Sequence, residues 1–135
     1  MVTKTLTGLA PFDRRFGGVF QGRVMLITAR QGSGKTMLGI QFLNEGLARG
    51  ERGLMLSATP SRDIAILAKS IGMPVDTAVE TGELHLLEYS DYIPGRDAEQ
   101  NIMLPPESFA QLQMAIEEHG IDRVVLDTVI PWMTF

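Results

Sequence analysis

A glycine-rich segment of eight residues carries the residue types that bind a polyphosphate. It runs Ala29-Arg30-Gln31-Gly32-Ser33-Gly34-Lys35-Thr36 and fits the P-loop pattern, with alanine in place of the first glycine. Glycines let the backbone bend so that successive N–H groups converge on phosphate oxygens, where a Cβ would obstruct them. Lys35 would place its ammonium against the β- and γ-phosphates, and the Thr36 hydroxyl would ligate Mg²⁺. The alternative is a flexible Gly/Ser turn with an incidental lysine.

A helix that begins at this turn would add further anion-binding groups. The first N–H groups of a helix have no partner within it, and the helix dipole places partial positive charge at the same end. We therefore predict that ATP is bound by the whole turn and by the first helical residues. The predicted nucleotide-binding residues are Ala29, Arg30, Gln31, Gly32, Ser33, Gly34, Lys35, Thr36 and Met37.

One aspartate ends the last strand-like run of the chain. Val124-Val125-Leu126-Asp127 is apolar until its final residue, which is a carboxylate. An aspartate at the end of a buried strand, downstream of a P-loop, is a usual place for Mg²⁺ to be held. We predict a metal site that consists of Thr36 and Asp127. The alternative is that Asp127 only caps the turn after its strand.

Hydrolysis needs a third group, one that orients or activates the attacking water. In many P-loop ATPases the group that orients or activates this water is a glutamate at the end of a neighbouring strand. The strand-like run at 53–57 ends in Ser57 and is followed by Ala58, so it carries no carboxylate there. Asp63 falls inside the next predicted helix, and Glu88 follows the third strand, a poor substitute on position alone. We therefore assign no catalytic residue.

Glycine and proline divide the chain into alternating strand-like and helix-like segments. The apolar patterns predict strands at 23–28, 53–57, 84–87 and 124–127, and helices over 37–47, 60–71 and 109–116. Thr59 stands where an N-cap belongs, with Pro60 at the first helical position. Residues 89–104 show no periodicity and are predicted to be an exposed loop, the alternative being a functional lid. Alternating strands and helices predict the α/β class, with a mostly parallel sheet covered on both faces.

Length and composition restrict the kind of protein. The chain has 135 residues, which suits one domain, and 44% of them are hydrophobic, as in globular proteins. Its 16 acidic residues outnumber 12 basic ones, which argues against nucleic acid as the main partner. No apolar run reaches the ~18 residues of a membrane helix or has the form of a signal peptide. With no cysteine, disulfides and thiolate metal sites are excluded. We expect a cytoplasmic protein without membrane contact.

Motifs along the whole chain resemble the KaiC-like branch of the RecA-type P-loop ATPases. They are Thr7-Gly8-Leu9 with Phe12-Asp13, Gly17-Gly18-Val19 with Gly22, the P-loop, residues 41–47 with Gly50-Glu51, Thr59-Pro60 through Gly72, and Arg123 to Asp127 as a Walker B strand. The resemblance implies ATP, Mg²⁺, a RecA-like sheet and a homo-oligomeric ring with nucleotide at subunit interfaces, or a partner protein in its place.

The sequence departs from the family pattern at two places. The family usually carries two adjacent glutamates at the end of the second strand, where Ser57 and Ala58 stand here. The family domain also continues with further strands beyond the position of Phe135. We therefore expect residues 1–135 to be a single, partial KaiC/RecA-like ATP-binding domain, incomplete at its C-terminal side.

Three functions remain open at this point. The first is a regulatory or assembly module that binds Mg·ATP and hydrolyses it slowly or not at all. The second is an active ATPase whose catalytic carboxylate comes from elsewhere, such as a neighbouring subunit. The third is a recombinase-like, DNA-dependent ATPase, which the acidic composition disfavours.

Overall fold

Three parallel strands form the centre of the protein. The structure, a computed structural model, describes residues 3–30, 32–88 and 106–127, with the backbone alone for residues 106–109. The sheet has the strand order β4-β3-β5, where β3 is Gly53–Ser57, β4 is Leu84–Glu88 and β5 is Arg123–Asp127. The predicted α/β class is confirmed, as are the strands predicted at 53–57, 84–87 and 124–127. The predicted loop at 89–104 lies outside the described residues.

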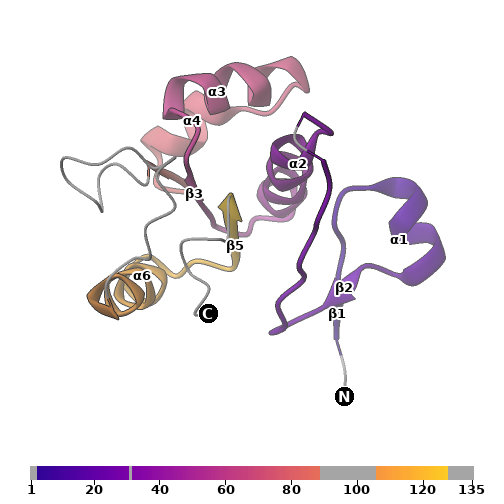
Figure 1. The fold of residues 1–135 in the computed structure, drawn as a ribbon, viewed down its shortest axis with the longest axis horizontal. Coiled ribbons are helices and arrows are strands. Elements are labelled where there is room, and N and C mark those ends of the chain that lie inside the picture. The colour runs from indigo at the N-terminus through magenta and orange to yellow at the C-terminus, as the bar shows by residue number, and fades with distance from the viewer. Residues whose placement is uncertain (1–2, 31, 89–105, 128–135) are drawn as a thin grey trace.

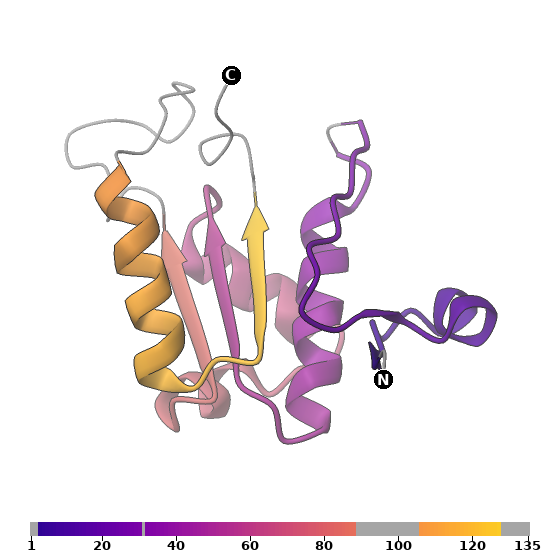
Figure 2. The same cartoon turned by 90° about the horizontal axis from the view of Figure 1, so that it is seen from below.

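Helices cover both faces of this sheet (Figures 1 and 2). On one face lie α2 (Lys35–Ala48), α3 (Ser61–Ser70) and α4 (Val75–Glu80), and on the other lies α6 (Pro106–His119). Residues of a strand point to alternate faces, so Met55 packs toward α2 and α3 while Leu54 and Leu56 pack toward α6. All five residues of β3 are buried, because its two faces are both covered.

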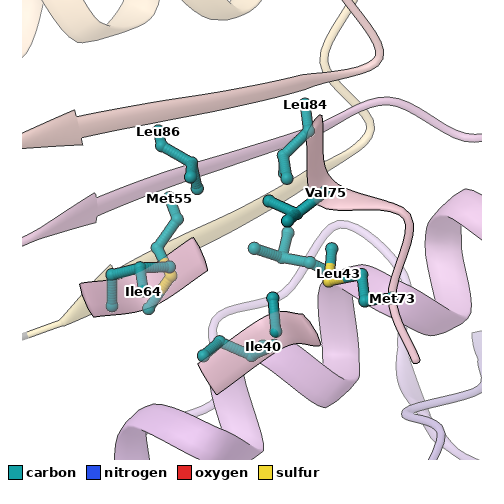
Figure 3. Close-up of a pocket in the computed structure, with 9 residues that line it drawn as sticks. Ile40, Leu43, Met55, Ile64, Met73, Val75, Leu84 and Leu86 are labelled. Carbon is teal, nitrogen blue, oxygen red and sulfur yellow. The ribbon is translucent and has the colours of Figure 1, made fainter. Parts of the chain in front are cut away.

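The larger of the two cores lies between the sheet and α2, α3 and α4. Figure 3 shows its side chains converging from the strands and the helices. The buried members of this core are Ile40, Leu43, Met55, Ile64, Ala68, Met73, Val75, Ala78 and Leu84. This core fixes α2 against the sheet, and α2 carries the first helical residues of the predicted P-loop site.

The N-terminal residues form a small unit beside α2. Two short strands, β1 (Lys4–Thr5) and β2 (Val19–Phe20), pair antiparallel around α1 (Ala10–Phe16). Inside this unit Thr7 is 2% exposed, and its hydroxyl donates to Oδ1 of Asp13 at 2.8 Å. Burial opposes ionisation of Asp13, but hydrogen bonds from Thr7 and Gly8 outweigh it and hold the pKa of this carboxyl below its usual value.

The strand predicted at 23–28 is wrong. Residues 23–30 have no regular secondary structure and run beside α2, and β5 is an edge strand with β3 as its neighbour (Figure 2). Val24 is 95% exposed and Leu26 60%. The apolar run predicted a buried strand because such runs pack in sheets, but a strand needs ladder hydrogen bonds to a neighbour, and this segment has none in the described sheet.

Two helix details also differ from the prediction. The N-cap of α3 is Pro60 rather than Thr59, and α3 begins at Ser61. The side chain of Pro60 forms no hydrogen bond to the first turn of α3. Instead, Oε1 of Glu88 accepts a hydrogen bond from the Ser61 N–H at 2.7 Å. The short helix α4 was not predicted, because six residues are fewer than two helical turns and leave almost no periodic signal.

Two histidines stack where α6 meets the start of β4. The ring centroids of His85 and His119 lie 4.4 Å apart, and Nε2 of His85 is buried with no hydrogen-bond partner among the described residues. Burial, then the His119 ring, lowers the pKa of His85 below its ordinary 6.5; Arg52 adds to this, and a backbone hydrogen bond at Gly82 opposes it.

We expect acid to destabilise the fold through His85. Because the pKa of His85 is lower in the folded state, the unfolded chain binds more protons once the pH drops below about 6.5. The free energy of unfolding therefore decreases as the pH is lowered through this range. Thermal melts at pH 7.5 and 5.5 check this, with His85→Phe as the variant that keeps a ring but cannot titrate. The variant should lose less stability between the two pH values than the wild type. Equal losses would contradict the assignment.

Candidate nucleotide and metal site

The carboxyl ends of the three parallel strands meet at one edge of the sheet. The register places Ser57 of β3 opposite both Glu88 of β4 and Asp127 of β5. Residues opposite one another in neighbouring strands point to the same face, and this is the face that carries α2 and α3, because Met55, two residues before Ser57, packs there. Three oxygen-bearing side chains therefore line one edge of the sheet on the α2 side.

The two residues predicted to hold a metal are in direct contact. Oγ1 of Thr36 donates a hydrogen bond to Oδ2 of Asp127 at 2.9 Å, across 91 positions of sequence. Thr36 lies in the first turn of α2, and Asp127 is the last residue of β5. The structure thus brings together two residues that the sequence analysis linked only through their motifs.

A glycine lets α2 come this close to β5. A Cβ added at Gly39 would lie 2.7 Å from Cγ1 of Val125, a distance that real Cβ contacts do not show. The absent side chain lets the helix backbone pack directly on the strand, one turn beyond Thr36. Glycine at position 39 therefore allows the close packing of α2 on β5 that brings Thr36 to Asp127.

The predicted phosphate loop is a glycine turn that enters the helix. Gly32 and Gly34 have φ angles of 80° and 93°, in the left-handed region that favours glycine. The Ser33 N–H donates to the carbonyl of Arg30 at 3.1 Å, which closes the turn. Residues 29, 30 and 32–34 are exposed, and Gln31 lies outside the described residues.

The start of α2 offers backbone donors on its open side. Gly34 is the N-cap and supplies no side chain, so the first N–H groups of the helix are not capped by it. The first α-helical bond runs from the Leu38 N–H to the Gly34 carbonyl at 3.0 Å. The amides of Lys35, Thr36 and Met37 precede that bond, and together with the helix dipole they form the kind of end that binds anions.

Lys35 is exposed and folds back over the loop. Its Nζ donates to the carbonyl of Ala29 at 2.9 Å, which joins the two ends of the glycine turn. A phosphate at the loop would compete with this carbonyl for the ammonium. An anionic oxygen is the stronger acceptor, because hydrogen bonds between ionised groups are roughly twice as strong as neutral ones.

Among the residues that the structure describes, the end of β3 carries no carboxylate that could activate water. Ser57 is 1% exposed and Ala58 is exposed, and neither carries an acid. Asp63 lies in the first turn of α3, as predicted, and Glu88 is engaged with the start of α3 through Ser61. Sequence reasoning missed this capping role of Glu88, since the register of β4 against β3 is not visible in a single sequence.

The donor set fits magnesium. Thr36 and Asp127 offer a hydroxyl and a carboxylate, the hard oxygen ligands that Mg²⁺ prefers, and Mg²⁺ is commonly held by one or two such groups together with phosphate and water oxygens. Among the described residues no cluster of three His, Asp or Glu side chains could hold a metal alone. When bound, the ion would neutralise charge on the phosphates.

Comparison with known proteins agrees with this arrangement. The protein-family model described as "ATPase: KaiC" matches residues 5–134. The circadian clock oscillator protein KaiC of Parathermosynechococcus lividus is 31% identical over 95% of this chain and 24% of its own length. The KaiC of Acaryochloris marina is 32% identical over 95% and 25%, and the clock protein KaiC2 of Synechocystis is 32% identical over 93% and 22%.

The chain spans about a quarter of the length of these curated relatives. None of the described helices is both long enough and apolar enough to cross a membrane. The family match extends through the glycine turn, the start of α2 and the end of β5, the three elements that meet at the candidate site. The chain belongs to the KaiC ATPase family, with a RecA-like P-loop fold.

Proposed function

We propose that this chain is a Mg·ATP-binding regulatory or assembly module in which hydrolysis is weak or absent. The observation that carries the proposal is the 2.9 Å hydrogen bond between Thr36 and Asp127. It joins the start of the P-loop helix to the end of the Walker B strand, so one bound ion can contact both residues. The exposed glycine turn and the uncapped start of α2 supply donors for the phosphates.

The proposed weak hydrolysis follows from the residue beside Thr36 and Asp127 at the end of β3, which is a serine and not a glutamate. A water that attacks the γ-phosphate needs an orienting or proton-accepting group within hydrogen-bond reach. At the end of β3 the chain offers the Ser57 hydroxyl, which is already bonded to Asp127 at 3.0 Å. A neutral hydroxyl with that partner is a poor base. ATP would therefore be held and turned over slowly.

The proposal extends to the assembly that the family resemblance implies. The complete protein would form a homo-oligomeric ring, or bind a partner protein, in the cytoplasm. An active ATPase remains the alternative if a neighbouring subunit supplies a carboxylate to this site. The acidic composition, 16 acidic against 12 basic residues, continues to disfavour a DNA-dependent enzyme.

Phosphate release from radiolabelled Mg·ATP tests the proposed weak hydrolysis. We expect purified wild-type protein to bind ATP and to release phosphate at a rate close to that of the Lys35→Ala variant. The variant removes the ammonium that would contact the phosphates and controls for contaminating ATPases. Clear turnover in the wild type that disappears in Lys35→Ala would overturn the regulatory proposal in favour of an active ATPase.

A further inference from the structure

The Ser57 side chain lies between the carboxylate of Asp127 and the backbone of Thr59. Its hydroxyl donates to Oδ2 of Asp127 at 3.0 Å and accepts a hydrogen bond from the Thr59 N–H at 3.0 Å. The bond from Thr59 occupies an acceptor position of the oxygen, so the hydroxyl proton is directed at the carboxylate. The direction of this hydrogen bond is therefore fixed by the backbone after β3.

The same carboxylate oxygen receives two hydroxyl donors. Thr36 reaches Oδ2 of Asp127 from α2 at 2.9 Å, and Ser57 reaches it from β3 at 3.0 Å. Two donors from different elements fix both the position and the rotation of the carboxylate. The described residues form no hydrogen bond to Oδ1, so that oxygen keeps its capacity to bind a cation.

Burial makes the Ser57 hydroxyl hard to replace. Ser57 is 1% exposed, and it lies in register with Asp127 in the paired strands β3 and β5. If the hydroxyl were removed, the carboxylate would lose one of its two donors, and water would have little access to take its place. If Thr36 turned its oxygen toward a bound ion, Ser57 would be the remaining hydroxyl that orients Asp127.

We propose that Ser57 is a positioning residue that holds Asp127 in the orientation required for Mg²⁺. The inference rests on the proposed function, because it needs Mg·ATP to bind at Thr36 and Asp127. Partners that orient a metal ligand typically contribute a factor of ~10–100 in metal affinity. Serine at this position thus stabilises the metal site and supplies no base, which agrees with binding without rapid hydrolysis.

The test compares the contribution of the metal in four proteins. ATP affinity is measured by calorimetry in Mg²⁺ and in EDTA. The dissociation constant in EDTA divided by that in Mg²⁺ reports how much the metal adds to ATP affinity. We expect Ser57→Ala to lower that ratio by about tenfold or more. Ser57→Thr, which keeps the hydroxyl and suits a strand, should restore it to within about threefold of the wild type.

Thr7→Ala is the matched control. It removes another buried hydroxyl that donates to an aspartate, at 2.8 Å, but in the N-terminal unit that contains Asp13. This variant should lose stability and keep the wild-type ratio. If Ser57→Ala lowers the melting temperature but keeps the ratio, Ser57 is structural only and the inference is wrong. If the wild type itself gains nothing from Mg²⁺, the proposed function fails first, which is a different result.

If Ser57→Ala does not fold, Ser57→Cys takes its place, since a thiol keeps the size of the side chain but is a weak donor. We expect Ser57→Cys to lower the ratio in the same direction as alanine. A ratio equal to that of the wild type in a folded Ser57→Cys protein would also overturn the inference.

Discussion

Lys35→Ala should abolish the stabilisation of this protein by Mg·ATP. A ligand that binds the native state adds about 2.7 kcal/mol to the free energy of unfolding at a hundred times its dissociation constant. For a chain of this size that is a melting shift on the order of 10 °C. Lys35 is exposed, and its bond to the Ala29 carbonyl lies on the surface, so the variant should keep the fold and lose the contact with the phosphates.

Lys69→Ala is the matched control for that experiment. Lys69 lies on α3, is 55% exposed and pairs with Asp76 at 2.7 Å, away from the glycine turn. An exposed pair contributes ~0–1 kcal/mol, so this variant should have near wild-type stability and the full nucleotide-dependent shift. A shift that survives in Lys35→Ala as fully as in Lys69→Ala would contradict the assignment of the P-loop.

Arg123→Ala should cost a large share of the folding stability, about 3–5 kcal/mol. Arg123 begins β5 and is 3% exposed, and its guanidinium forms an ion pair with Glu51 at 3.0 Å. It also donates to the carbonyls of Leu6 and Phe42 at 2.7 and 2.8 Å. The substitution leaves these acceptors without their donor and opens a cavity beside α2.

Urea unfolding checks this effect against a matched arginine. Arg49 pairs with Glu45 at 2.8 Å on the exposed side of α2, with 47% of its side chain exposed, and Arg49→Ala should cost only ~0.5 kcal/mol. Because folded domains have about 5–15 kcal/mol in total, Arg123→Ala should move the urea midpoint clearly and Arg49→Ala barely. Similar midpoints for the two variants would show that Arg123 is not the link between the N-terminal unit, α2 and β5.

Elements with a strong local signal could be predicted from the sequence. The strands at 53–57, 84–87 and 124–127 were predicted because continuous apolar runs occur where both faces of a sheet are covered. The run at 23–28 has the same composition, yet its side chains are exposed, because burial of a strand depends on a neighbour elsewhere in the chain. The composition of a segment does not show whether another strand pairs with it.

The candidate site was predictable in its parts but not in its connections. The glycine turn and Asp127 have motif signals, so their residues could be named in advance. The contact of Ser57 with Asp127 depends on the register of β3 against β5, and the burial of Arg123 depends on three segments meeting at one side chain. Long-range registers of this kind leave no periodic trace in one sequence.

The resonances of the glycine-turn amides give the most direct test of nucleotide binding. Two-dimensional amide NMR spectra of the wild-type protein are recorded without ligand and with saturating Mg·ATP. We predict that the largest changes occur at Gly32, Ser33, Gly34, Lys35 and Thr36, whose N–H groups would receive the phosphates, with a smaller change at Asp127. If saturating Mg·ATP leaves these amides in place, or moves only residues elsewhere, this chain does not hold a nucleotide at its P-loop.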